Sequence, residues 1–304
     1  MNADIKYTII IPHYNLPNLL ERALKSIPLR SDIQVIIVDD CSCDQNKVAL
    51  YELQKKFPQM EFYFSSVNGG GGKARNIGLK YARGEYVIFA DADDFFTPEF
   101  SDILTSYKDS DEYDVIYFGN CSANSDTLEP SDRDNQLSSF FQLAYENPVK
   151  GEMLCRYIFG EPWCKIVKRR IILDNKIQFD ETPIHNDTKY SYLVGYFGKK
   201  IKLDPREGYC ITSRNNSVSK QISDRNMIFR EMVFCNKMSF FKKKGIPVID
   251  PFVFTPILSA LKSKKIFLVG RLLKIISKSD YSIINIFKDY RKYKKNGYFR
   301  GRNL

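Results

Sequence analysis

The chain has 304 residues, of which 43% are hydrophobic and 14% aromatic, so it can bury a core in one large or two modest domains. Its net charge of +10 is unevenly placed: residues 219–304 hold 20 Lys and Arg against 5 Asp and Glu, whereas residues 1–218 hold 26 against 31. No apolar run reaches the roughly 20 residues of a membrane-spanning helix. Two histidines exclude a histidine-rich metal centre, and seven cysteines without C-x-x-C spacing are expected to be reduced. The N-terminus lacks the features of a secretory signal, so we expect a cytoplasmic protein.

Strands and helices alternate through the N-terminal third. Apolar runs predict strands at residues 8–12, 34–38, 61–65 and 86–90. Helical spacing predicts helices at 17–26, at about 47–56, and between the glycine-rich stretch at 68–72 and Gly84. This alternation predicts a parallel, right-handed, doubly wound sheet with helices on its faces.

Three carboxylates follow the strand at 86–90, namely Asp91, Asp93 and Asp94. Clustered carboxylates resist ionising together unless a cation or a basic partner neutralises them, and Mg²⁺ or Mn²⁺ is the natural cation beside phosphate oxygens. The alternative is that Asp93 and Asp94 cap a helix starting near residues 97–99. Because ligands bind at the carboxyl ends of such strands, the pair Asp39 and Asp40, after the second strand, is expected at the same crevice.

The glycine-rich stretch at 69–72 opens a helix near the same edge of the predicted sheet. Its bare backbone would let a phosphate approach, and Lys73 and Arg75 would supply positive charge. Val67 and Ala74 exclude a P-loop, and Arg75 occupies a position where the dinucleotide motif needs glycine. A hinge is the alternative role of these glycines.

The chain beyond residue 100 gives weaker signals. Residues 114–118 predict another strand, 122–136 predict a polar surface loop, and an apolar helix is predicted from Tyr190. The one tryptophan, Trp163, lies in the sequence Glu-Pro-Trp-Cys-Lys, and Asp187 follows His185 and Asn186. The acidic part of the chain ends with the polar residues 214–219.

These pieces, taken in order, resemble the inverting family 2 glycosyltransferases of the GT-A fold. They comprise residues 9–15, 38–42, 68–70 with 74–78, 84–86 with 91–94, and 163–165, and the resemblance extends over residues 6–219. Cys41 replaces the family's usual glycine. The resemblance implies an α/β fold, with a Rossmann-like, mostly parallel sheet flanked by helices in residues 1–218. A basic, mainly helical region is expected to follow in residues 219–304.

The resemblance also implies where a nucleotide sugar binds. Pro12 and Tyr14 would line the slot for the base, and Asp40 would accept a hydrogen bond from a pyrimidine ring, which favours UDP. Asp91 and Asp93 form the Asp-x-Asp motif, with Asp93 the direct ligand of Mn²⁺ or Mg²⁺. The other residues expected at the nucleotide sugar are Gly70, Lys73, Arg75 and Ala92, with Asp94 beside the transferred sugar.

On the same resemblance Asp187 falls at the family's catalytic base. The residue before that base is usually Glu, whereas this chain has Asn186, and the alternative role of Asp187 is to cap the following helix. Trp163 would stack on a sugar ring or pack in the core. Arg214 and Ser217 would cover the diphosphate, or are ordinary surface residues.

The implied reaction moves a sugar from a nucleotide sugar to a hydroxyl of a saccharide or lipid-linked saccharide, as in surface polysaccharide synthesis. A carboxylate would deprotonate the acceptor while a cation neutralises the departing diphosphate. Two other functions stay open. One is a phosphatase of the haloacid dehalogenase type, which would leave Asp39 and Asp40 unexplained. The other is a nucleic-acid-binding protein that uses the basic C-terminal region, although the sequence shows no recognised nucleic-acid-binding module.

The basic C-terminal region predicts an amphipathic helix. Lys264, Arg271, Lys274 and Lys278 fall within about 80° of one another at helical spacing, and apolar residues face elsewhere. Attachment to the cytoplasmic face of an anionic membrane, where a lipid-linked acceptor would be presented, is one interpretation. The other is that these helices pack on the catalytic domain with a solvated charged side.

Overall fold

The computed structural model describes residues 5–131, 136–213 and 223–296. The chain forms two compact units. The first comprises Met1–Glu181 with Lys189–Ser217, and the second comprises Thr182–Thr188 with Val218–Leu304. The short segment 182–188 therefore belongs to the second unit, although its neighbours in the sequence belong to the first.

An eight-stranded sheet forms the centre of the first unit, with the strand order β3-β2-β1-β4-β7-β6-β8-β5. The four strands β1 (Tyr7–His13), β2 (Ile33–Asp39), β3 (Glu61–Phe64) and β4 (Tyr86–Phe89) are parallel. All four were predicted from their apolar runs. Burial is nearly complete along β1 and β4, as expected for strands covered on both faces.

The remaining strands make the sheet mixed. β7 (Lys165–Lys168) is antiparallel to both β4 and β6 (Val115–Asn124). β8 (Ile201–Ser213) is parallel to β6 and antiparallel to the short β5 (Phe95–Phe96). The prediction of a mostly parallel sheet is confirmed, and the antiparallel placement of β5 and β7 makes the sheet mixed. An apolar run alone does not encode the direction in which its strand enters the sheet.

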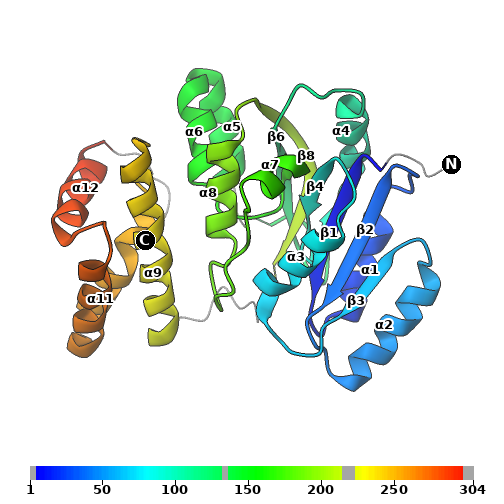
Figure 1. Cartoon of the computed structure of the whole chain (residues 1–304), viewed down its shortest axis with the longest axis horizontal. Helices are drawn as coiled ribbons and strands as arrows, with labels where there is room; N and C mark the ends of the chain where they lie inside the picture. The colour runs from blue at the N-terminus through cyan, green and yellow to red at the C-terminus, as the bar shows by residue number, and fades with distance from the viewer. Residues whose placement is uncertain (1–4, 132–135, 214–222, 297–304) are drawn as a thin grey trace. The chain divides into compact units, whose positions relative to one another are not determined.

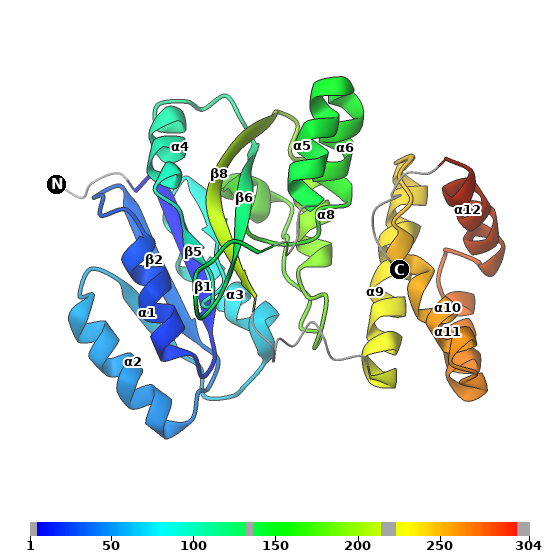
Figure 2. The ribbon, with the colours of Figure 1, turned by 180° about the vertical axis from the view of Figure 1, so that it is seen from behind.

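Helices cover both faces of this sheet. In Figure 1 α3 (Gly70–Tyr81) lies in front of β1 and β2, and the view from behind in Figure 2 brings α1 (Pro17–Ser26) to the front of the same strands. Gly78 allows the close approach of α3, since a Cβ there would lie 2.5 Å from Ile10 Cγ2. The other helices of this unit are α2 (Asp44–Lys56), α4 (Glu99–Tyr107), α5 (Gln136–Glu146), α6 (Pro148–Tyr157), α7 (Arg169–Asp174) and α8 (Thr188–Phe197).

Two predicted loops are wrong in part. The glycine-rich stretch is helical from Gly70 onward, because α3 begins there. The polar stretch at 122–136 begins inside β6, which extends to Asn124, and Ala123 pairs with Pro130. The polar residues at the end of β6 were therefore predicted as part of a surface loop, because polar composition alone does not distinguish the two.

Residues 223–296 of the second unit are mainly helical. They contain α9 (Asp224–Lys244), the 3₁₀ turn η2 (Pro251–Val253), α10 (Thr255–Lys262), α11 (Ile266–Lys278) and α12 (Ile283–Asn296). α9 starts at a Ser223 cap and ends at Gly245, whose φ is +66°. The buried residues that α9, α10 and α11 share are Met227, Ala260, Leu268 and Leu272. No helix in the part of the chain that the structure describes has the length and apolar content needed to cross a membrane.

Candidate active site

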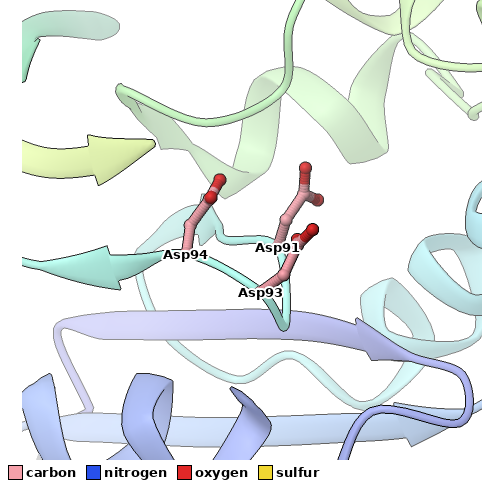
Figure 3. A group of neighbouring side chains, drawn as sticks. All are labelled: Asp91, Asp93 and Asp94. Atoms are coloured by element: carbon pink, nitrogen blue, oxygen red, sulfur yellow. The ribbon is translucent and has the colours of Figure 1, made fainter. Parts of the chain in front are cut away.

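The three predicted carboxylates meet in a turn at the carboxyl end of β4. Asp94 N donates to Asp91 O over 3.2 Å, which closes the turn. One carboxylate oxygen from each of Asp91, Asp93 and Asp94 lies within 4.8 Å of the others. In Figure 3 the side chains of Asp91 and Asp93 lie next to each other, and Asp94 projects from the other end of the turn. Three oxygen donors in this arrangement suit a hard divalent cation.

Asp94 is the buried member of the cluster. Its oxygens accept hydrogen bonds from Thr212 N over 2.7 Å and from the Tyr209 hydroxyl over 3.1 Å. Burial, followed by the charges of Asp93 and Asp91, raises the pKa of Asp94 well above its usual range. The Tyr209 oxygen in turn accepts a hydrogen bond from Asp91 N over 2.8 Å. Asp94 thus ties the turn to β8, and this contact explains its burial.

Arg75 neutralises part of the cluster from α3. Its Nη2 lies 2.6 Å from Asp91 Oδ1, and 8% of the Arg75 side chain is exposed. The same guanidinium lies 5.5 Å from the ring centre of Phe179. The structure brings Arg75 to the carboxylates, where it reduces their mutual repulsion. The expected role of Arg75 beside a phosphate stays a prediction.

Asp40 caps α3. Its carboxylate oxygens accept hydrogen bonds from Gly69 N over 2.8 Å and from Gly70 N over 2.6 Å. The positive end of the α3 dipole therefore already faces a carboxylate. Lys73 lies across Gly69, since a Cβ at Gly69 would clash with its Cδ. This geometry argues against an open phosphate-binding loop at the glycines.

The carboxyl ends of β2 and β4 lie at the same edge of the sheet. Both strands pair in parallel with β1, which separates them, so Asp40 and the acidic turn face the same edge. Tyr14, which follows β1 at this edge, is 49% exposed. Pro12 lies at intermediate exposure near the end of β1. The residues expected to bind the base are therefore gathered near the end of β1 and in the adjoining loops.

A buried network holds these loops. His13 Nδ1 lies 2.9 Å from Asp39 Oδ1, and Ser42 Oγ donates to the same oxygen over 2.5 Å. Burial raises the pKa of Asp39, but the hydrogen bonds from His13 and Ser42 outweigh it and leave the pKa below its usual value. Cys41 adopts a φ of 64°, the left-handed conformation that favours glycine. Cys41 therefore has a backbone conformation that suits the glycine usual in the family at this position.

Trp163 is part of the core. It is 5% exposed, its ring stacks on Tyr209 with centres 5.7 Å apart, and Phe159 meets it edge-on at 5.2 Å. These contacts favour the packing role over a sugar-stacking role. Ala92 is likewise buried within the acidic turn.

Three residues that contact the acidic turn were missed in the sequence. Arg22 Nη2 donates to Asp93 O over 2.5 Å and its Nη1 to Ser125 O over 2.7 Å. Thr212 Oγ1 donates to Asp93 O over 2.6 Å. Tyr209 joins Asp91 and Asp94, as described above. No sequence signal marked them, because each lies far from residues 91–94 along the chain and its type is common in helices and strands.

The remaining predicted residues lie elsewhere. Asp187 belongs to the second unit, with the segment 182–188. Arg214 and Ser217 lie outside the described residues. The helix-capping alternative for Asp93 and Asp94 is not favoured, since α4 begins at Glu99 with Pro98 at its cap and no side-chain hydrogen bond there.

The fold and the acidic turn define a class of protein. A mostly parallel sheet with an Asp-x-Asp turn after its central strand is the GT-A architecture of glycosyltransferases. The chain belongs to this class: the family model described as glycosyl transferase family 2 matches residues 8–173, more than half of its length.

Relatives with assigned names support the same family. The chain is 28% identical over 181 residues to the poly(ribitol-phosphate) beta-N-acetylglucosaminyltransferase TarS of Staphylococcus aureus, covering 58% of this chain and 30% of TarS. It is 25% identical over 260 residues to the glycosyltransferase GlyA of Streptococcus pneumoniae, covering 82% of this chain and 36% of GlyA. The chain therefore matches about a third of the length of these two relatives.

Solved structures show the same fold. Residues 1–349 of S. aureus TarS in complex with UDP-GlcNAc match with a TM-score of 0.58 and 20% identity, over 97% of this chain and 93% of that one. The mannosyltransferase PcManGT of Pyrobaculum calidifontis, in complex with GDP-Man and Mn²⁺, matches with a TM-score of 0.56 and 16% identity, over 96% and 81%.

Proposed function

We propose that this protein is a metal-dependent inverting glycosyltransferase that takes its sugar from a UDP-sugar. The acceptor is a hydroxyl of a saccharide or lipid-linked saccharide in surface polysaccharide synthesis. The observation that carries this proposal is the convergence of three carboxylates within 4.8 Å at the carboxyl end of β4. Family membership and the TarS complex with UDP-GlcNAc support the choice of donor.

The residues of the acidic turn fit a divalent cation. Asp91 and Asp93 would hold it, with Asp93 as the direct ligand, while Asp94 fixes the turn through Thr212 and Tyr209. When bound, Mn²⁺ or Mg²⁺ supplies positive charge for the departing diphosphate. Arg75 adds positive charge beside Asp91.

The proposed reaction is one in-line displacement. The Asp187 carboxylate takes the proton of the acceptor hydroxyl, and the oxygen forms a bond to C1 of the sugar as the bond from C1 to the UDP oxygen breaks. Attack opposite the leaving group inverts the configuration at C1. Pro12, Tyr14 and Asp40 would hold the base of the nucleotide at the sheet edge.

Attachment to a membrane is a separate part of this proposal. We place it at the junction of α10 and α11, where Ile266 and Phe267 are 80% and 92% exposed and Lys262 and Lys264 are also exposed. The apolar residues Leu268, Leu272 and Ile276 of α11 are buried, so the proposed attachment uses other residues than the apolar side of that helix. The anionic lipid face of the cytoplasmic membrane is the proposed partner.

Release of UDP from a panel of nucleotide sugars tests the donor and the reaction. Slow hydrolysis of a UDP-sugar that needs Mn²⁺ supports the proposal. Phosphate release from sugar phosphates would instead favour the phosphatase, in which Asp91 would be the nucleophile despite its ion pair with Arg75. DNA retention sensitive to salt, without turnover of any nucleotide sugar, would favour the nucleic-acid-binding alternative.

A further inference from the structure

The segment that carries Asp187 is held by the C-terminal helices. Residues 182–188 group with residues 218–304 in the second unit. The main contact is His185: Arg230 Nε on α9 donates to His185 Nε2 over 3.0 Å. The His185 ring also lies edge-on to Phe234 of α9 at 5.1 Å and tilted against Phe252 of η2 at 6.4 Å. Three side chains of the C-terminal region therefore fix this one ring.

The backbone of the segment is tightly turned. His185 has a φ of 53°, a left-handed conformation that costs an ordinary residue about 1–2 kcal/mol. Thr188 N donates to His185 O over 3.4 Å, and Thr182 Oγ1 donates to Ile184 O over 2.9 Å. Such a conformation persists only where the surroundings determine it, and the contacts of His185 with α9 and η2 provide that support.

The protonation state of the His185 ring allows it to accept the hydrogen bond from Arg230. Burial, and then the positive charges of Arg230 and Lys237, lower the pKa of His185 to about 4. The ring is therefore neutral at neutral pH, and its Nε2 can accept the hydrogen bond from Arg230.

We propose that Arg230, acting through His185, is a positioning residue that fixes the turn carrying Asp187. The C-terminal helices then position a proposed catalytic residue in addition to offering an attachment region. This inference rests on the proposed function, in which Asp187 is the base. A displacement of about 1 Å at a reacting group can lower the rate by up to about a hundredfold, so loss of the Arg230 contact is expected to reduce turnover.

Hydrogen–deuterium exchange of the full chain tests the structural half of this proposal. Arg230→Leu removes the donor to His185, so amides in residues 184–188 should exchange at least tenfold faster than in the wild type. Arg225→Leu is the matched control, since Arg225 lies on the same helix, is exposed and contacts Phe229. Equal exchange of residues 184–188 in both variants would overturn the proposal, whatever the activity of the protein.

Hydrolysis of UDP-N-acetylglucosamine with Mn²⁺ tests the functional half. Arg230→Leu should lower kcat about tenfold at unchanged KM for the donor, Arg230→Lys should recover part of the loss, and Arg225→Leu should match the wild type. An unchanged kcat in Arg230→Leu, with Asp187→Asn inactive, would refute the positioning role. If Asp187→Asn hydrolyses the donor as fast as the wild type, the assignment of the base fails instead, and the exchange experiment still decides whether Arg230 holds the turn.

Discussion

Asp91 and Asp93 lie side by side at the acidic turn because other residues offset their repulsion. Arg75 pairs with Asp91, and the backbone carbonyl of Asp93 accepts hydrogen bonds from Arg22 and Thr212. These contacts hold the carboxylates in place. If the turn binds a cation as proposed, binding does not carry the cost of ordering these ligands.

Removal of Arg22 should weaken the proposed cation site. Arg22→Met keeps the length of the side chain but loses the donors to Asp93 O and Ser125 O. We expect the Mn²⁺ concentration for half-maximal UDP release to rise about tenfold, which corresponds to about 1.4 kcal/mol.

The control for this prediction is Arg30→Met. This variant also loses a partly buried ion pair, in which Arg30 lies 2.7 Å from Asp32. Among the described hydrogen bonds, however, Arg30 makes none with the acidic turn. A Mn²⁺ requirement that rises equally in both variants would show a general loss of stability and would remove Arg22 from the site.

The sequence predicted the cluster of acidic residues but not the residues that hold it in place. Asp91, Asp93 and Asp94 are nearly consecutive and follow an apolar strand, so their meeting was predictable. Tyr209 and Thr212 reach the turn from β8, more than 110 positions later in the chain, and the pairing of β8 with β5 and β6 brings them there. Long-range pairing of this kind leaves no local pattern.

At the scale of elements, α3 is a helix whose first residues are glycines. Four successive glycines favour a loop in isolation, since glycine is costly inside a helix. Here Asp40 accepts hydrogen bonds from Gly69 N and Gly70 N, and Gly78 lets the helix pack closely on β1. Tertiary contacts therefore stabilise a helix that propensity alone opposes.

α9 contains a buried acid that makes stability depend on pH. Burial raises the pKa of Glu231 to about 7, and the hydrogen bond from Cys235 only partly offsets it. The unfolded chain releases this proton near pH 4.5, so the folded protein holds more protons between pH 4.5 and 7. The free energy of unfolding contributed by Glu231 is therefore lost as the pH rises through that range, by about 3 kcal/mol.

Glu231→Gln should remove this dependence, because glutamine stays neutral. Urea unfolding at pH 4.5 and at pH 8 measures it: the wild type should lose about 3 kcal/mol relative to the variant between the two values. The opposite titration of His185 is common to both proteins and cancels in the comparison. Parallel pH profiles would contradict the buried, protonated state of Glu231.

Element types and the parallel direction of β1 to β4 were largely predictable, whereas the direction of β7 was not. The positions of β1 to β4, α1 and α11 follow from apolar spacing within each segment. The antiparallel placement of β7, between β4 and β6, depends on how the chain returns to the sheet after α5 and α6. The sequence also could not decide whether the apolar side of α11 packs against other helices, because the same pattern suits a helix on a membrane surface. In the structure α9 and α10 bury that side.

For the molecule as a whole, the uneven charge separates an acidic unit from a basic one. If the junction of α10 and α11 meets anionic lipid, Phe267→Ser in the full chain should weaken binding to phosphatidylglycerol vesicles about tenfold, because burial of a Phe side chain contributes about 1.5–3 kcal/mol. Sedimentation with vesicles at two salt concentrations measures this.

Leu29→Ser is the matched control for vesicle binding. Leu29 is 83% exposed and lies in the first unit, away from the basic region in the sequence. Binding that falls equally in both variants, or a wild-type chain that does not sediment with these vesicles, would refute the membrane surface proposed here.

The central claim is that Asp91 and Asp93 bind a cation together with the diphosphate of a nucleotide. The thermal midpoint of the wild type and of Asp93→Asn, each with UDP alone and with UDP plus Mn²⁺, tests it most directly. In the wild type, Mn²⁺ should raise the midpoint further than UDP alone does. The added free energy of stabilisation is up to about 2.7 kcal/mol when the ligand is at a hundred times its dissociation constant, and Asp93→Asn should lose this addition. An equal addition in both proteins, or no shift with any nucleoside diphosphate, would contradict the account.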